Sequence, residues 1–215
     1  MNVNINVGRL AAIALVVAVV CGAGAAGARE LRGFDVTPFM GYQFGGKFTS
    51  YEGDLNVVDN QNYGILVDIP ISRSGHKAEI LYSRQDTVFE LRTSPPDRVT
   101  RHLFDITVEY YNIGAIMEKP KGKVRPYGAV TLGGARFAPK TGDYSDEWFF
   151  NITFGGGAKA YLSKHVGLRA DLRVLAPMNF AGTGLWVGTE GVEFGMATGS
   201  VITQGNVSLG LMINW

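Results

Sequence analysis

Three histidines are the side chains in this sequence best suited to acid–base or nucleophilic catalysis. His102 follows Ser94 and Asp97, and an acyl-ester hydrolase needs these three residue types within hydrogen-bond reach of one another. No local motif of a lipid deacylase surrounds His102, so a polar residue near a strand end is the favoured interpretation. The other two histidines lie in short polar connections. We therefore predict no catalytic residue, no metal site and no cofactor.

Ten charged side chains stand at alternate positions of segments rich in apolar residues. Successive side chains of a strand point to opposite faces, so these charges share one face and the apolar residues share the other. The ten residues are Asp35, Asp68, Glu79, Asp105, Glu109, Arg125, Lys159, Arg169, Asp171 and Arg173. The alternation by itself does not say which face is inside.

The elements that position these charges are segments of about ten alternating residues, the repeated pattern of a transmembrane barrel. Short polar connections at 72–76, 118–123 and 163–166 alternate with mostly longer ones at 44–62, 93–98, 139–147 and 178–203. We predict an all-β, eight-stranded antiparallel up-and-down transmembrane β-barrel. Arms at 185–187 and 192–196 are too short to span a membrane and are interpreted as an external hairpin that extends the barrel wall, with ten strands as the alternative. The eight segments are 34–44, 63–71, 77–91, 101–116, 124–137, 148–162, 168–176 and 204–215.

The first 28 residues are predicted to be a signal peptide. Arg9 precedes an apolar run at 10–20, which is too short for a membrane-spanning helix, and Ala26-Gly27-Ala28 fits a small-x-small cleavage site. We place cleavage after Ala28, with Ala25 as second choice, so that 29–215 form the mature barrel domain. Val20 disfavours a lipoprotein acylated at Cys21. The net charge of +1 gives no reason to expect nucleic acid as a partner.

The last strand decides between two environments for the apolar face. Its alternating apolar residues end on an aromatic side chain, which together with the signal peptide favours lipid outside and a polar interior. The alternative is a periplasmic or secreted β-protein whose charged face is wet. An eight-stranded barrel is so narrow that its side chains fill the lumen, so the charges must pair across it. The apolar residues of this strand are Val207, Leu209, Leu211, Ile213 and Trp215.

Aromatic side chains near the predicted strand ends suggest girdles at the two membrane interfaces. They are Tyr63, Tyr82, Tyr110, Trp148, Tyr161 and Trp215.

Three stretches resemble the OmpA-like family of small outer-membrane β-barrel proteins. They are the strand and loop at 38–46, the Arg-Pro-Tyr-Gly at 125–128, and the block at 154–162 with Gly167-Leu168-Arg169. The last strand also resembles the closing-strand signal read by the barrel assembly machinery. The resemblance implies a barrel in the bacterial outer membrane, in contact with lipid and lipopolysaccharide. We expect a monomer, and we expect no wall-anchoring role because no peptidoglycan-binding domain follows the barrel segments.

The family resemblance specifies the architecture better than the activity. The first hypothesis is a non-enzymatic protein that contributes to envelope structure or to interactions through its external loops. A narrow passive pore for small solutes is the alternative, and a lipid-modifying enzyme is a third hypothesis.

The terminal aromatic generates the first testable prediction. Trp215→Ser removes the aromatic side chain of the expected assembly signal and leaves the register of the strand unchanged. We expect lower outer-membrane levels and more periplasmic degradation, measured by immunoblotting of cell fractions. Wild-type levels of the folded variant would contradict a role in assembly.

Overall fold

The computed structural model describes residues 33–50, 53–92, 100–119, 121–140, 146–178, 186–188, 191–193 and 203–215. The predicted signal peptide at 1–28 lies outside these residues, as do Ser94, Asp97 and the side chain of His102. Within the described part of the chain, no helix is long and apolar enough to cross a membrane.

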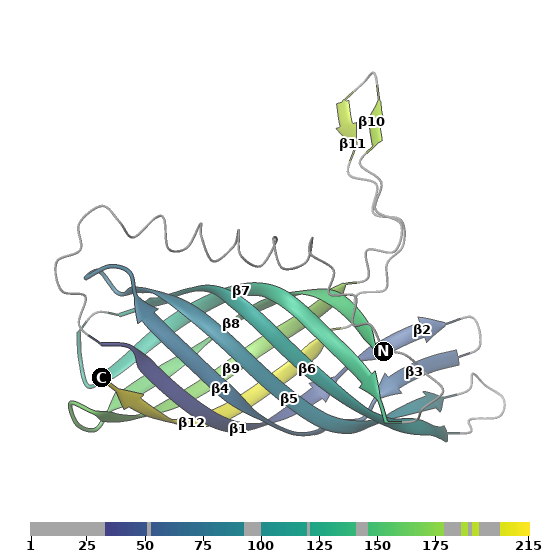
Figure 1. The fold of residues 1–215 in the computed structure, drawn as a ribbon, viewed down its shortest axis with the longest axis horizontal. Coiled ribbons are helices and arrows are strands. Elements are labelled where there is room, and N and C mark those ends of the chain that lie inside the picture. The colour runs from purple at the N-terminus through teal and green to yellow at the C-terminus, as the bar shows by residue number, and fades with distance from the viewer. Residues whose placement is uncertain are drawn as a thin grey trace, which may run out of the picture. The chain divides into compact units, whose positions relative to one another are not determined.

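Eight long antiparallel strands form a closed barrel, which confirms the predicted fold class (Figure 1). Each strand pairs with two neighbours, and the ring closes where β1 pairs with β12 and β5 pairs with β6. Closure gives every wall strand a hydrogen-bonding partner on both sides, as a spanning structure in lipid requires. The wall strands are β1 (Asp35–Gly45), β4 (Asn60–Pro70), β5 (His76–Arg92), β6 (Thr100–Glu118), β7 (Val124–Pro139), β8 (Glu147–Tyr161), β9 (Val166–Met178) and β12 (Gln204–Asn214).

Two short hairpins lie in the long connections, and the sequence predicted a hairpin only in the second of them. β2 (Lys47–Ser50) pairs with β3 (Gly53–Val57), and β3 continues the sheet beside the end of β5. β10 (Trp186–Gly188) pairs with β11 (Gly191–Glu193) in a separate two-stranded sheet. The described strands therefore form an eight-stranded ring, not a ten-stranded one.

The short connections gather at the end of the barrel where the C-terminus lies (Figure 1). In the connection from β4 to β5, the Ile71 amide donates to the His76 carbonyl oxygen at 2.9 Å. Gly75 in this turn has φ +97°, a conformation that L side chains rarely adopt. The β2–β3 hairpin lies at the opposite end of the barrel.

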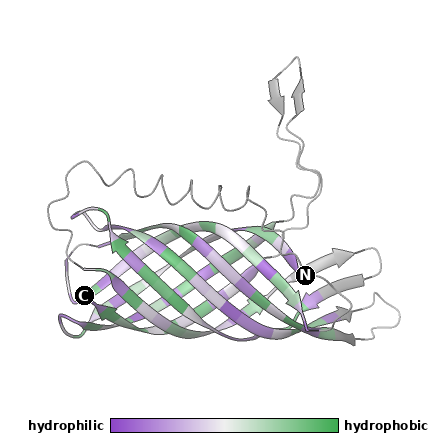
Figure 2. Cartoon of the chain, viewed as in Figure 1, coloured by the Kyte–Doolittle hydropathy of each residue, from purple (hydrophilic) through white to green (hydrophobic). Residues whose placement is uncertain are grey.

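The two faces of the wall differ sharply in polarity, as the alternating colours along the strands show (Figure 2). On β9, Leu172 is 59% exposed on the outside, whereas its neighbours Asp171 and Arg173 are buried inside. A soluble barrel would show the reverse arrangement. The exposed apolar side chains include Met40, Ile65, Ile80, Met117, Val130, Leu132, Phe154, Leu168, Leu172, Val174, Val207, Leu209 and Leu211.

The expected orientation of the fourth segment is wrong. Ile106, Val108 and Tyr110 point into the barrel, and Asp105 and Glu109 therefore belong to the outer face of β6. The alternation predicts the apolar side chains of this segment on the outside, as on the other strands. In the part of β6 nearest the loops, apolar side chains therefore face the lumen and charged side chains face outward.

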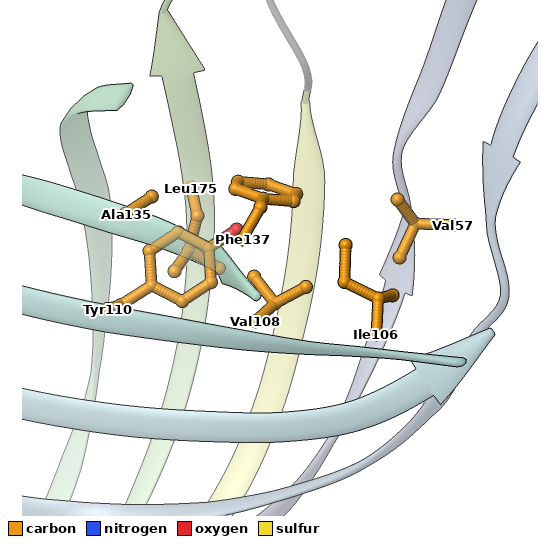
Figure 3. Close-up of a cluster of buried hydrophobic side chains, with 7 residues drawn as sticks. All are labelled: Val57, Ile106, Val108, Tyr110, Ala135, Phe137 and Leu175. Atoms are coloured by element: carbon orange, nitrogen blue, oxygen red, sulfur yellow. The ribbon is translucent and has the colours of Figure 1, made fainter. Parts of the chain in front are cut away.

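The inward apolar side chains of β6 belong to a cluster that we call the lumen plug (Figure 3). Its aromatic residue Phe137 packs edge to face on Phe149, with ring centroids 5.0 Å apart. The plug fills the lumen near the strand ends that lead to the loops. Its buried members are Val57, Ile106, Val108, Tyr110, Ala135, Phe137 and Leu175.

The outward apolar face predicts a depth-dependent response to a charged substitution. Leu172→Arg places a guanidinium against lipid near mid-strand and should lower the free energy of unfolding by about 2 to 4 kcal/mol. Leu162→Arg, beside a turn at the membrane edge, should cost only about 0 to 1 kcal/mol. Denaturant titration of vesicle-inserted protein, followed by tryptophan fluorescence, measures both. Equal costs for the two variants would argue against a lipid-facing wall.

Candidate functional site

The inner face of β9 supplies the centre of a charged network. Arg169, Asp171 and Arg173 alternate along this strand and are 1%, 5% and 3% exposed. Charges this deeply buried are costly unless they are paired and hydrogen-bonded. The structure places them in the lumen, as expected from the sequence, and surrounds them with side chains from the opposite strands.

Arg169 contacts three carboxylates from three strands. Its Nη1 lies 2.7 Å from Asp68 Oδ2, its Nη2 2.5 Å from Glu79 Oε2 and its Nε 2.6 Å from Asp171 Oδ2. Its Nε also donates to the Tyr127 hydroxyl at 2.9 Å, and the guanidinium stacks over the Tyr127 ring, 4.7 Å from its centroid. The planar fork of arginine suits this multiple contact, which a lysine does not reproduce.

Arg173 shares two of the same acids. Its Nη1 and Nη2 donate to the two oxygens of Glu79 at 2.7 and 2.9 Å, a bidentate pair. Its Nη2 also lies 2.8 Å from Asp171 Oδ1. Glu79 and Asp171 each bridge both arginines, which keeps two like charges close together on one strand.

Lys159 on β8 links this centre to a second group of charges. The ammonium lies 2.5 Å from Asp68, 3.2 Å from Asp35 and 3.2 Å from Glu118, and the lysine side chain is fully buried. Lys77 joins the same acids, at 2.6 Å from Asp35 and 3.0 Å from Glu118. Two ammonium groups thus hold two carboxylates between them.

The network ends near the short turns. Arg125 Nη1 lies 3.2 Å from Glu118 Oε1, and the Tyr161 hydroxyl donates to the same oxygen at 2.8 Å. The Arg125 guanidinium stacks over the Tyr161 ring, 4.1 Å from its centroid. Arg125 is half-buried, so it marks the boundary between lumen and solvent.

The lumen network balances five acids with five bases. Of the predicted residues, the structure brings together eight and leaves out Asp105 and Glu109. Two of the ten members, Lys77 and Glu118, were not predicted. Lys77 stands two residues before Glu79 and so on the same face, a signal that was available, whereas Glu118 fell in a predicted connection. The members are Asp35, Asp68, Glu79, Glu118, Asp171, Lys77, Arg125, Lys159, Arg169 and Arg173.

Uncharged polar side chains lie between the charged network and the lumen plug. Asn112 donates to Thr153 Oγ1 at 2.9 Å, and Gln43 donates to Gln204 Oε1 at 2.8 Å. The Tyr110 hydroxyl also donates to Gln204, which connects this layer to the plug. Neutral polar side chains thus separate the charged network from the lumen plug, and a second, smaller apolar cluster, Phe39, Leu66 and Leu81, is buried between the acids and the polar residues of β4 and β5.

The arrangement of the lumen network is suited to ion pairing. Each acid of the lumen network faces a cation at 3.2 Å or less. Among the described residues, no group of three or more His, Cys, Asp or Glu side chains is placed to hold a metal ion. Two of the aromatic residues predicted to form the membrane girdles, Tyr110 and Tyr161, instead point into the lumen. Their hydroxyls donate hydrogen bonds to Gln204 and Glu118 there.

The predicted assembly-signal residues lie on the outer face of β12. Val207, Leu209 and Leu211 are exposed there, and the Trp215 ring stacks on Phe34 of the neighbouring chain segment, with centroids 5.2 Å apart. Ile213 is half-buried on the same face. A stacked aromatic pair therefore marks the turn-bearing end of the apolar wall.

Comparisons with known proteins give the fold. The sequence matches no protein-family model and no curated protein. The structure resembles Neisserial surface protein A with a TM-score of 0.53 and 15% identity, covering 85% of this chain and 97% of that chain. It resembles the outer membrane protein OprG from Pseudomonas aeruginosa with a TM-score of 0.53 and 9% identity, covering 86% and 96%. At these identities the likeness shows a shared small-barrel fold.

The full burial of the Lys159 ammonium leads to a second prediction, about the free energy of unfolding. Lys159→Met leaves Asp35, Asp68 and Glu118 each with one cation fewer and should cost about 3 to 5 kcal/mol of unfolding free energy. Lys164→Met, on an exposed turn, is the matched control and should change it by less than about 0.5 kcal/mol.

A double variant separates charge imbalance from loss of packing. Adding Asp68→Asn to Lys159→Met restores the charge balance of the lumen and should recover part of the loss. Both are read from denaturant titrations in vesicles. If Lys159→Met behaves like Lys164→Met, the network contributes nothing measurable to stability.

Proposed function

We propose that this chain is a non-enzymatic outer-membrane β-barrel protein that contributes to envelope structure or presents its loops outside the cell. The observation that carries the proposal is the inverted polarity of the barrel, with an apolar outer wall around a neutralised charged lumen. Lipid accepts such a wall and water does not. The likeness to two small barrel proteins, one of them named as an outer membrane protein, supports the same location.

The assembly route and the partners follow from that location as further parts of the proposal. The outward apolar face of β12 would be read by the barrel assembly machinery, and the rest of the wall would contact outer-membrane lipid, including lipopolysaccharide. A closed ring whose strands are all paired needs no second copy for its backbone, which supports a monomer. The β2–β3 hairpin, at the end away from the short turns, would stand on the external side.

The side chains that fill the lumen favour a barrel that does not conduct ions over a passive pore. Arg169 is in contact with acids from β4, β5 and β9, so its side chain bridges the interior. The lumen plug adds an apolar layer, which is a barrier to ions. An ion crossing the barrel would have to displace both layers.

Two measurements on the intact protein test the proposal. The outer-membrane fraction should contain a band whose gel mobility changes on boiling, because a closed barrel resists unfolding in detergent. The same protein, reconstituted into planar bilayers, should show no steady conductance. A periplasmic band insensitive to heat would overturn the membrane assignment, and regular single-channel steps would favour the pore.

A further inference from the structure

The outer wall carries a cluster of charges on the neighbouring strands β5, β6 and β7 and beside the ends of β7 and β8. We call it the girdle cluster. Of the two residues wrongly predicted to face the lumen, Asp105 and Glu109, Glu109 is a member. The surrounding outward positions of the wall are mainly apolar. The members of the girdle cluster are Arg84, Asp86, Glu109, Arg136, Lys140 and Asp146.

Three members form a row across the wall. Arg84 pairs in register with Glu109, and Glu109 pairs with Arg136 on the next strand. Neighbouring strands lie about 4.8 Å apart, so the two arginine backbones are separated by roughly 10 Å. Arg136 Nη1 is 2.8 Å from Glu109 Oε2, and Arg84 Nη1 is 3.9 Å from Glu109 Oε1. The carboxylate, 7% exposed, lies between two guanidinium groups that are about one-third exposed.

Aromatic side chains fix the depth of this row. Tyr82 and Tyr111 lie one outward position nearer the middle of the wall, and their hydroxyls donate to Glu109 at 2.9 and 3.2 Å. Trp148, in register with Arg136, packs on Tyr111 with ring centroids 5.7 Å apart. Amphipathic rings of this kind sit at the level of lipid headgroups. The cluster therefore lies at the interface on the loop side, opposite the Phe34–Trp215 pair.

The remaining contacts hold the basic side chains in place without using all their donors. Asp86 lies 3.1 Å from Arg84 and 3.2 Å from Lys140, and Asp146 lies 2.6 Å from Arg136. Three bases balance three acids, so the cluster exerts little long-range attraction. The hydrogen bonds of Arg84 to Asp86 use two of its five N–H donors. An acceptor at the same depth can take the others.

We propose that the girdle cluster docks a phosphate group of lipopolysaccharide in the outer leaflet. The guanidinium forks of Arg84 and Arg136 donate to the phosphate oxygens, Lys140 adds a point charge, and the acids orient the bases. The acyl chains then lie along the apolar outward residues below, such as Ile80 and Val130. This proposal rests on the proposed outer-membrane function and assigns a binding site to one of its lipid partners.

The test measures lipid binding to folded, purified protein in detergent by native mass spectrometry. The probes are lipid A carrying its phosphates, dephosphorylated lipid A, and phosphatidylglycerol. The variant Arg84→Gln/Glu109→Gln/Arg136→Gln removes both forks together with the carboxylate between them, so no buried acid is left unpaired. It should bind phosphorylated lipid A at least about tenfold more weakly, as expected for the loss of a single charge-assisted hydrogen bond.

A matched control removes charges at the other end of the barrel. Arg73→Gln/Lys121→Gln changes two exposed bases at the short turns and should bind lipid A like the wild type. The wild type should prefer phosphorylated lipid A over both other probes. Equal binding of dephosphorylated lipid A, equal binding of phosphatidylglycerol, or unchanged binding by the triple variant would each overturn the proposal. A wild-type chain that shows no heat-dependent gel mobility would instead overturn the proposed function.

Discussion

Charge neutrality inside a narrow lumen is the constraint on which the rest of this barrel depends. Arg169 touches three carboxylates, and each of these acids reaches a further base, so the ion pairs form one connected set. Removing a single member leaves the lumen with one uncompensated charge, which costs more than an ion pair itself contributes. The strands that supply the charges must therefore keep their mutual register, because a slip by one residue would turn each charge toward lipid.

The sequence was sufficient to predict the closed ring and the inner face of most strands. In the segment around Arg169, charged and apolar residues alternate without exception, so the two faces are unambiguous. Once the apolar face of this strand is assigned to lipid, the charged faces of its neighbours must point into the lumen. The strand bounds were right to within a few residues. The hairpin formed by β2 and β3 was missed because polar residues and glycines dominate at 44–62.

The outer part of β6 could not be oriented from alternation, for a physical reason. Beyond the aromatic side chains the wall is no longer surrounded by hydrocarbon, so apolar side chains can face the interior and charged ones the outside, as in a soluble barrel. Val108 inside and Glu109 outside obey that second rule. A pattern of two alternating faces is the same under either rule, and only the depth at which the rule changes distinguishes them.

The inner face of β8 has no side chain at two successive inward positions, Gly155 and Gly157, and this has a consequence for how the lumen can vary. A Cβ on Gly155 would lie 2.6 Å from Arg173 Cγ, and one on Gly157 would lie 2.7 Å from the Tyr127 hydroxyl. The glycines thus vacate the volume that the long side chains of β7 and β9 occupy. The number of strands sets the diameter of the lumen, so the total volume of the inward side chains is constrained as strictly as their net charge. A larger residue on one strand requires a smaller one across from it, and inner positions can change only as coupled pairs, whereas outer positions can exchange one apolar side chain for another independently.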